Sequence, residues 1–186
     1  MFKTILAVLC FFAVPASAAW GQALPTASRA GDLQIGGGFG LAYPDYTFSK
    51  FTGFVGYGDF DFREHFGVEA DFHYVSGAST DQIYEKTYEI GGRYVRHYGI
   101  INPYAKVMIG RGVFNFPLPA GAPSGSAHPN LAYNIMGLGA GADFNIRRTI
   151  NVRGDIEYQD WFGFPPHGLN PTVITIGAAY HFNFLK

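Results

Sequence analysis

The chain has 186 residues and carries 13 Lys and Arg against 14 Asp and Glu, for a net charge of −1. Without a basic block, this balance excludes nucleic acid as an expected partner. Charged residues make up only 15% of the chain, against about 25% in typical soluble domains, so a surface that faces water throughout is not expected.

The first residues have the form of an export signal. Lys3 gives a positive start, residues 5–14 form an apolar run, and Ala-Ser-Ala at 16–18 has the small side chains of a cleavage site. The run is shorter than the roughly 20 residues that a membrane-spanning helix needs, so no helical anchor is predicted. The single cysteine, Cys10, lies inside this run, and the mature chain is therefore expected to contain no disulfide.

Beyond residue 31, apolar and polar residues alternate, as in β-strands with one apolar face. In residues 150–159 every even-numbered residue is apolar or Gly and every odd-numbered residue is polar. A tilted strand needs about 9–11 residues to cross a bilayer, close to the length of these segments. In chain order, the pattern predicts strands over residues 32–42, 51–62, 66–74, 84–95, 103–114, 131–144, 150–159 and 172–182.

The predicted connections between these strands alternate in length. Short, polar connections at one end and longer ones at the other are typical of outer-membrane barrels, with the short turns in the periplasm. Both chain termini are then expected on the periplasmic side. The short connections are residues 63–65, 96–102 and 145–149, and the long ones are residues 43–50, 76–83, 115–130 and 162–170.

Alternation alone does not say whether the apolar face lines the lumen or meets lipid. The interior of an eight-stranded barrel is only just filled by side chains, and all the Phe, Tyr, Ile and Val residues of these faces would overfill it. We therefore predict an all-β fold, an eight-stranded antiparallel up-and-down transmembrane β-barrel, whose closure leaves no strand edge in lipid. A soluble secreted barrel or sandwich, with the faces reversed, is the alternative.

An outward apolar face places charged residues in the lumen, with nine acidic residues against three basic ones. Buried charges persist only when they are paired or hydrated, so an ion-pair network or a water column is expected there. Glu69, Arg93, Lys106 and Arg153 lie at similar depths in their strands, which makes a salt-bridge layer plausible. The predicted lumen polar network is Glu69, Asp71, Glu89, Arg93, Lys106, Arg153, Asp155 and Glu157, and the other inward residues are Asp59, Asp61, His73, Glu85, Asp143 and His181.

Aromatic residues near the strand ends predict two girdles at the membrane interfaces. The girdle at the short-turn end is assigned Tyr104, Phe144, Tyr180 and Phe182, and the girdle at the long-loop end is assigned Tyr74, Tyr84, Phe114, Trp161 and Phe162.

These features together resemble the bacterial outer-membrane β-barrel domain family, which includes outer membrane protein A-like barrels and opacity-type surface proteins. The resemblance covers nearly all of the mature sequence and rests on the signal peptide and on residues 88–94, 102–105 and 177–182. The last segment looks like the family's C-terminal insertion signal, carried here by Gly177, Tyr180 and Phe182. Residues 183–186 follow it, so the signal ends at Phe182 or Phe184.

The resemblance implies a location in the Gram-negative outer membrane, with outer-membrane lipid as the surroundings. It also implies the barrel assembly machinery and periplasmic chaperones as partners during biogenesis. We expect residues 1–18 to be a cleaved signal peptide, residues 19–30 a short periplasmic segment and residues 31–186 the barrel domain.

Function is not fixed by this resemblance, because members of the family have varied activities. We expect a non-enzymatic protein with a structural or surface-interaction role. The alternatives are a narrow, porin-like pore with an acidic lumen and a membrane enzyme that modifies lipid A. An enzyme needs a nucleophile and a base, and the only close Ser and His pair, Ser126 and His128, lies in a Pro- and Gly-rich loop that would hold geometry poorly. No catalytic residue is assigned.

Histidine spacing predicts no metal site, because His73, His97, His128, His167 and His181 include no pair at i and i+4. No metal and no cofactor is therefore assigned. The last long loop either binds an unknown extracellular ligand or merely completes the outer girdle, and the sequence favours neither. The residues concerned are Trp161, Phe162, Phe164, Pro165, Pro166 and His167.

Overall fold

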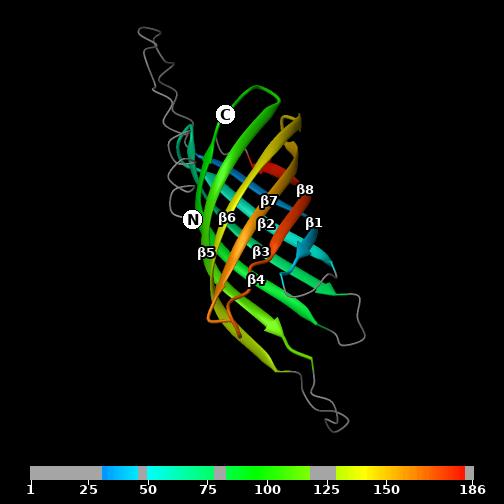
Figure 1. Cartoon of the computed structure of the whole chain (residues 1–186). Coiled ribbons are helices and arrows are strands. Elements are labelled where there is room, and N and C mark those ends of the chain that lie inside the picture. Colours follow the sequence, from blue (N-terminus) through cyan, green and yellow to red (C-terminus); the bar gives the residue numbers. More distant parts are fainter. Residues whose placement is uncertain (1–30, 46–49, 78–82, 118–128, 183–186) are drawn as a thin grey trace.

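The structure is a computed structural model that describes residues 31–45, 50–77, 83–117 and 129–182. In these ranges, eight antiparallel strands form one closed barrel in which neighbours in the chain pair and the last strand pairs with the first (Figure 1). The strands are β1 (Asp32–Tyr43), β2 (Phe51–Asp61), β3 (Phe66–Gly77), β4 (Tyr84–Val95), β5 (Ile101–Asn115), β6 (Asn130–Arg147), β7 (Ile150–Phe162) and β8 (Thr172–Phe182). The predicted all-β, up-and-down barrel is confirmed.

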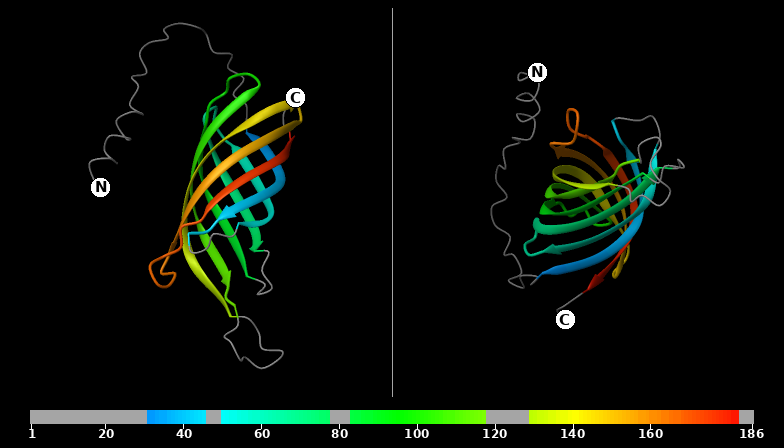
Figure 2. Two further views of the ribbon diagram at one scale, coloured as in Figure 1. Left: turned by 45° about the vertical axis from the view of Figure 1, so that its right-hand side comes forward. Right: turned by 90° about the horizontal axis from the view of Figure 1, so that it is seen from below.

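The connections alternate in length as predicted. Figure 2 shows strongly tilted strands wound about one axis, with the tight turns that follow β2, β4 and β6 at one end. We call this the turn end, and the opposite end, where the connections after β1, β3, β5 and β7 lie, the loop end. No helix in the described ranges is long and apolar enough to cross a membrane.

Strand boundaries differ from the prediction mainly in β3, which continues to Gly77, and in β5, β6 and β7. β7 continues three residues beyond the predicted end at 159, to Phe162, and Trp161 pairs there with Ile135 of β6. The alternating pattern ends early because the inward side chains near the loop end are themselves apolar, so the two faces no longer differ in polarity. At its other end β6 reaches Arg147 through a register shift between Asn145 and Arg147.

Side chains alternate between an apolar exterior and a polar lumen. Ile90, Ile109 and Ile176 are 59%, 62% and 65% exposed on the outside, while the residues next to them in sequence point inward. An exposed apolar band of this kind suits lipid rather than water, and the alternative with an apolar lumen is wrong for these strands. Charged side chains on this exterior, among them Lys86 and Arg111, lie near the loop end.

The predicted aromatic girdles are wrong at three positions. Tyr104, Phe114 and Trp161 are buried in the lumen instead of facing lipid. The prediction used only height along the strand, whereas alternation decides the side: Tyr104 points to the same side as Lys106, and Trp161 to the same side as Gln159. The outward positions assigned to the girdles are Phe144, Tyr180 and Phe182 at the turn end and Tyr74, Tyr84 and Phe162 at the loop end.

The predicted signal peptide at 1–18 and the periplasmic segment at 19–30 lie outside the described residues, as do residues 183–186 and the Ser126–His128 pair. They stay predictions. Gly177, Tyr180 and Phe182 lie on β8, where the rings of Tyr180 and Phe182 face outward with centroids 5.0 Å apart.

Candidate functional site: the charged lumen

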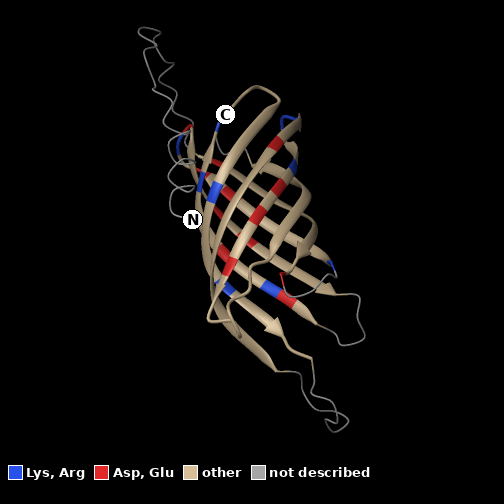
Figure 3. Ribbon diagram, in the orientation of Figure 1, with Lys and Arg blue, Asp and Glu red and all other residues tan. Residues whose placement is uncertain are grey.

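The charged residues of the lumen gather in the middle of the barrel. Alternate residues of β2 to β7 point inward, and Figure 3 shows the resulting acidic and basic bands on successive strands. All eight residues of the predicted polar network are buried there, at 7% exposure or less. Most of them belong to two groups along the barrel axis, which we call the arginine layer and the lysine layer; Glu89 lies between the lysine layer and the loop end.

The arginine layer, nearer the turn end, consists of Arg93, Arg153, Asp59 and Asp143. Arg93 donates to Asp59 at 2.5 Å and to Asp143 at 2.7 Å, and Arg153 donates to the same two carboxylates at 2.7 and 2.8 Å. Each carboxylate therefore bridges both guanidinium groups. Charge-assisted, multidentate pairs of this kind are strong and geometrically specific, so the layer holds β2, β4, β6 and β7 together across the lumen.

Aromatic rings complete the arginine layer. The Arg153 guanidinium lies 4.1 Å from the centroid of the Tyr57 ring and 4.9 Å from that of Tyr104, and Arg93 lies 4.5 Å from Tyr104. Cation–π contacts at such distances stabilise a desolvated guanidinium. The burial of Tyr104, which the girdle prediction placed in the membrane interface, thus has a clear role inside the barrel.

The lysine layer surrounds one ammonium group. Lys106 Nζ lies 2.6 Å from Asp71, 2.9 Å from Glu157, 3.0 Å from Glu69 and 3.2 Å from Asp155. One ammonium is therefore shared by four carboxylates. Glu69 joins the two layers, because it also contacts Arg93 at 3.2 Å and Arg153 at 3.3 Å.

Polar contacts continue from the lysine layer toward the loop end. His73 Nδ1 lies 2.8 Å from Thr87 Oγ1 and 3.4 Å from Glu89. Gln159 Nε2 donates to Glu89 at 2.7 Å and to Glu157 at 2.8 Å, and Trp161 Nε1 donates to the Gln159 oxygen at 3.1 Å. His73, Thr87 and Gln159 were not assigned to the network, although alternation places them inward; a count of charges alone misses such neutral members.

The lumen is closed at the loop end by apolar side chains. We call this group the loop-end cluster; it consists of Phe114, Ile135, Trp161, Phe164 and Leu169. The Trp161 ring packs directly against the backbone at Gly112, where a Cβ would overlap the ring.

The loop-end cluster corrects the prediction for the last long loop. Trp161 and Phe164 were assigned to a surface that meets a ligand or the membrane, yet both are buried in this cluster. Both side chains turn inward and cover the mouth of the barrel. Phe162, Pro165, Pro166 and His167 stay exposed.

Two cavities mark where the lumen is not filled. A vestibule of about 630 Å³ opens at the turn end and reaches Arg93 and Asp143 of the arginine layer, with Asp32, Gln34, Asp61 and His181 along its wall. Beyond the arginine layer lies a cavity of about 10 Å³, lined in part by Tyr57, Asp71, His73 and Thr175.

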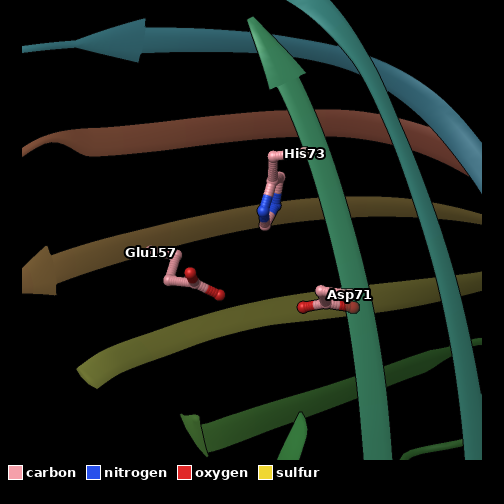
Figure 4. Close-up of side chains that lie close together, drawn as sticks. All are labelled: Asp71, His73 and Glu157. Atoms are coloured by element: carbon pink, nitrogen blue, oxygen red, sulfur yellow. The ribbon is translucent and has the colours of Figure 1, made fainter. Parts of the chain in front are cut away.

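Within the described part of the chain, one group of side chains has the composition of a metal site. Asp71, His73 and Glu157 each offer a ligand atom, and these atoms all lie within 4.8 Å of one another (Figure 4). The spacing of histidines in the sequence predicted no metal site. Glu157 of β7 meets the two β3 residues only across the lumen, a proximity that residue spacing does not indicate.

The family model for the outer membrane protein beta-barrel domain matches residues 4–182 of this chain. The chain belongs to this family. The resemblance noted from the sequence is thereby confirmed, and so is the location in a Gram-negative outer membrane. No curated protein is similar enough in sequence to count as a match.

Solved structures of small outer-membrane barrels share the fold. The attachment invasion locus protein Ail of Yersinia pestis has a TM-score of 0.61 at 18% identity, covering 82% of this chain and 99% of that one. Neisserial surface protein A has a TM-score of 0.67 at 9% identity, covering 82% and 97%. OprG of Pseudomonas aeruginosa has a TM-score of 0.60 at 16% identity, covering 84% and 98%. At these identities the likeness extends to the fold alone.

Proposed function

We propose that this protein is a non-enzymatic outer-membrane barrel whose lumen is a structural plug and whose working surface is its loop end. The proposal rests on the observation that side chains fill the lumen. The arginine and lysine layers join strands across the barrel, and the loop-end cluster closes the mouth above them. A lumen built in this way stabilises the barrel and presents the loops on a rigid support.

A narrow pore is the second candidate, and the vestibule and the acidic excess are the observations in its favour. An ion entering the vestibule would meet Arg93 and Arg153, held by paired carboxylates, and beyond them a cavity of about 10 Å³, the size of about one water molecule. Passage would require both layers and the loop-end cluster to rearrange. We therefore favour a plug.

Planar-bilayer recording of the refolded full chain separates the plug from the pore. Folding is verified first by a gel shift between boiled and unboiled samples. We expect no steady conductance from the wild-type protein. A cation-selective conductance that falls in the E69Q and D71N variants would overturn the plug. Arg93→Ala together with Arg153→Ala removes only the arginine layer, so we expect this variant to stay silent too while the lysine layer and the loop-end cluster remain in place.

The loop chemistry bears on the kind of partner. Ail has been crystallised in complex with sucrose octasulfate, a heparin analogue. In the present chain the four long connecting segments, 43–50, 76–83, 115–130 and 162–170, contain one Lys and no Arg, which offers little to a polyanion. Exposed Phe162, Pro165 and Pro166 instead favour an apolar protein surface as the extracellular partner.

Two measurements test the surface role. Cells that express the protein should adhere to cultured cells more than cells that express a variant with residues 162–168 replaced by Gly and Ser, while both proteins show the gel shift. Equal adhesion would count against the loop end as the working surface. Lipid A of unchanged mass in expressing cells is expected, and a modified lipid A would establish an enzyme instead.

A further inference from the structure

The side chains of Asp71, His73 and Glu157 converge in the lysine layer. Asp71 and His73 are two residues apart on β3, so both point inward, and Glu157 reaches them from β7 (Figure 4). All three are at most 5% exposed. We propose that these residues bind a divalent transition-metal ion, of the Zn²⁺ or Mn²⁺ class, inside the lumen.

The charge of the lysine layer favours a bound cation. In the arginine layer, two carboxylates, Asp59 and Asp143, are matched by two guanidinium groups. In the lysine layer, a single ammonium serves Asp71, Asp155 and Glu157, and it also shares Glu69 with the two arginines. Buried charges persist only when they are paired or bind a metal. A divalent cation would supply the positive charge that the lysine layer lacks.

Unpaired polar atoms next to this group are a second, independent observation. Tyr57 Oη, Thr175 Oγ1 and Asp71 Oδ1 are buried and have no hydrogen-bond partner in the described ranges. Their residues line the same cavity of about 10 Å³ as His73. Buried polar groups in native proteins are nearly always hydrogen-bonded, and a polar cavity of roughly this size holds one water molecule. A water bound to the metal would satisfy them.

The donor set selects the class of metal. One imidazole nitrogen with two carboxylate oxygens suits first-row divalent ions and excludes the soft ions that need thiolates. Three protein ligands and one water make an open four-coordinate site, as in catalytic zinc sites. Bonds of about 2.1 Å imply ligand atoms roughly 3.5 Å apart, so the side chains, now within 4.8 Å, would close slightly around the ion.

Neighbouring residues are placed to support such a site. His73 Nδ1 faces Thr87 at 2.8 Å and Glu89 at 3.4 Å, which orients the ring and leaves Nε2 for the metal when Nδ1 carries the proton. Ligating histidines commonly donate their other nitrogen to such a carboxylate. Lys106 would retain its contacts with Glu69 and Asp155 when the ion takes over Asp71 and Glu157.

Metal titration of the refolded full chain tests the proposal. After refolding, all metal is removed with EDTA and the EDTA is dialysed away. The protein is then titrated with Mn²⁺, the free ion is followed by electron paramagnetic resonance, and Zn²⁺ is added as a competitor. We expect one bound Mn²⁺ per chain, displaced by Zn²⁺. The variants His73→Gln and Glu157→Gln should bind at least about tenfold more weakly.

The matched control is Asp143→Asn, which removes one buried acid from the arginine layer. It should bind Mn²⁺ as the wild type does. If Asp143→Asn and Glu157→Gln weaken Mn²⁺ binding equally, the ion is attracted by the acidic lumen as a whole and the proposed site is overturned. The proposal is also overturned if the wild type binds neither Mn²⁺ nor Zn²⁺. If His73→Gln shows no gel shift, Glu157→Gln decides alone, since it removes an acid from a layer that has a surplus.

Discussion

The arginine and lysine layers lie side by side in one lumen and compensate buried negative charge in different ways. Asp59 and Asp143 each meet two guanidinium groups, whereas Lys106 pairs with Asp71, Asp155 and Glu157 and shares Glu69 with both arginines. A guanidinium is a planar fork that pairs with several carboxylates at once, while an ammonium is a compact point charge. Asp59 and Asp143 of the first layer thus each have two cationic partners, whereas three carboxylates of the second share one ammonium, so the second layer depends on an additional cation or water.

Arg153→Met should have the largest effect, because it breaks the arginine layer. It leaves Asp59 and Asp143 with one guanidinium and removes the cation from Tyr57, while Tyr104 keeps Arg93. An uncompensated buried charge costs several kcal/mol, and we expect a loss of about 5 kcal/mol in the free energy of unfolding. Urea unfolding in lipid vesicles, followed by the gel shift, measures it. A loss below about 1 kcal/mol would show that the lumen is hydrated instead of paired.

Lys106→Met removes the ammonium that pairs with Asp71, Asp155 and Glu157 and should cost about 3 kcal/mol, within the range for breaking a buried ion pair. Unlike the loss in Arg153→Met, this loss should be largely recovered in Mn²⁺, since a ligand that binds only the folded state stabilises it. The same unfolding series with Mn²⁺ or EDTA provides the measurement. If Mn²⁺ restored the stability of both variants equally, the two layers would not differ in their dependence on an added cation.

Neutralising one acid in each layer gives a more direct comparison. Asp143→Asn removes charge-assisted hydrogen bonds to both arginines and should destabilise the barrel by about 2 kcal/mol. Glu157→Gln, in EDTA, removes a surplus charge and should change stability by less than about 1 kcal/mol. Unfolding midpoints measured in parallel decide between these outcomes; the reverse order would locate the surplus charge in the arginine layer.

Gly139→Ala should have a smaller effect than Arg153→Met, Lys106→Met or Asp143→Asn. A Cβ at position 139 would lie 2.6 Å from Lys106 Cε, and the ammonium of that side chain is held by four carboxylates. Overpacking of this kind costs about 1–3 kcal/mol, and we expect the lower end. Gly92→Ala is the matched control, because a Cβ there meets no atom within 4 Å. Similar losses in both variants would point to the backbone instead of the lysine layer.

The sequence predicted much of this molecule because one strong pattern governs it. Side chains on a strand alternate with a period of two, so residues 150–159 separate the apolar face of β7 from its polar face, and the small volume of an eight-stranded lumen assigns the apolar face to lipid. The ends of β4 and β8 were predicted correctly, and every charged residue assigned to the network lies in the lumen. The same rule would also have placed Tyr104 and Trp161 inward, had alternation been preferred to height along the strand.

The tertiary structure alone decided which lumen residues meet. Arg153 and Asp59 are separated by 94 positions, and their pairing depends on strand tilt and register around the closed barrel, which no local pattern records. For the same reason Asp71, His73 and Glu157 meet across the lumen although nothing near them in sequence has metal-ligand spacing. The sequence determined the fold and the side of each residue through local geometry; barrel closure determined the partners, because it brings distant strands face to face.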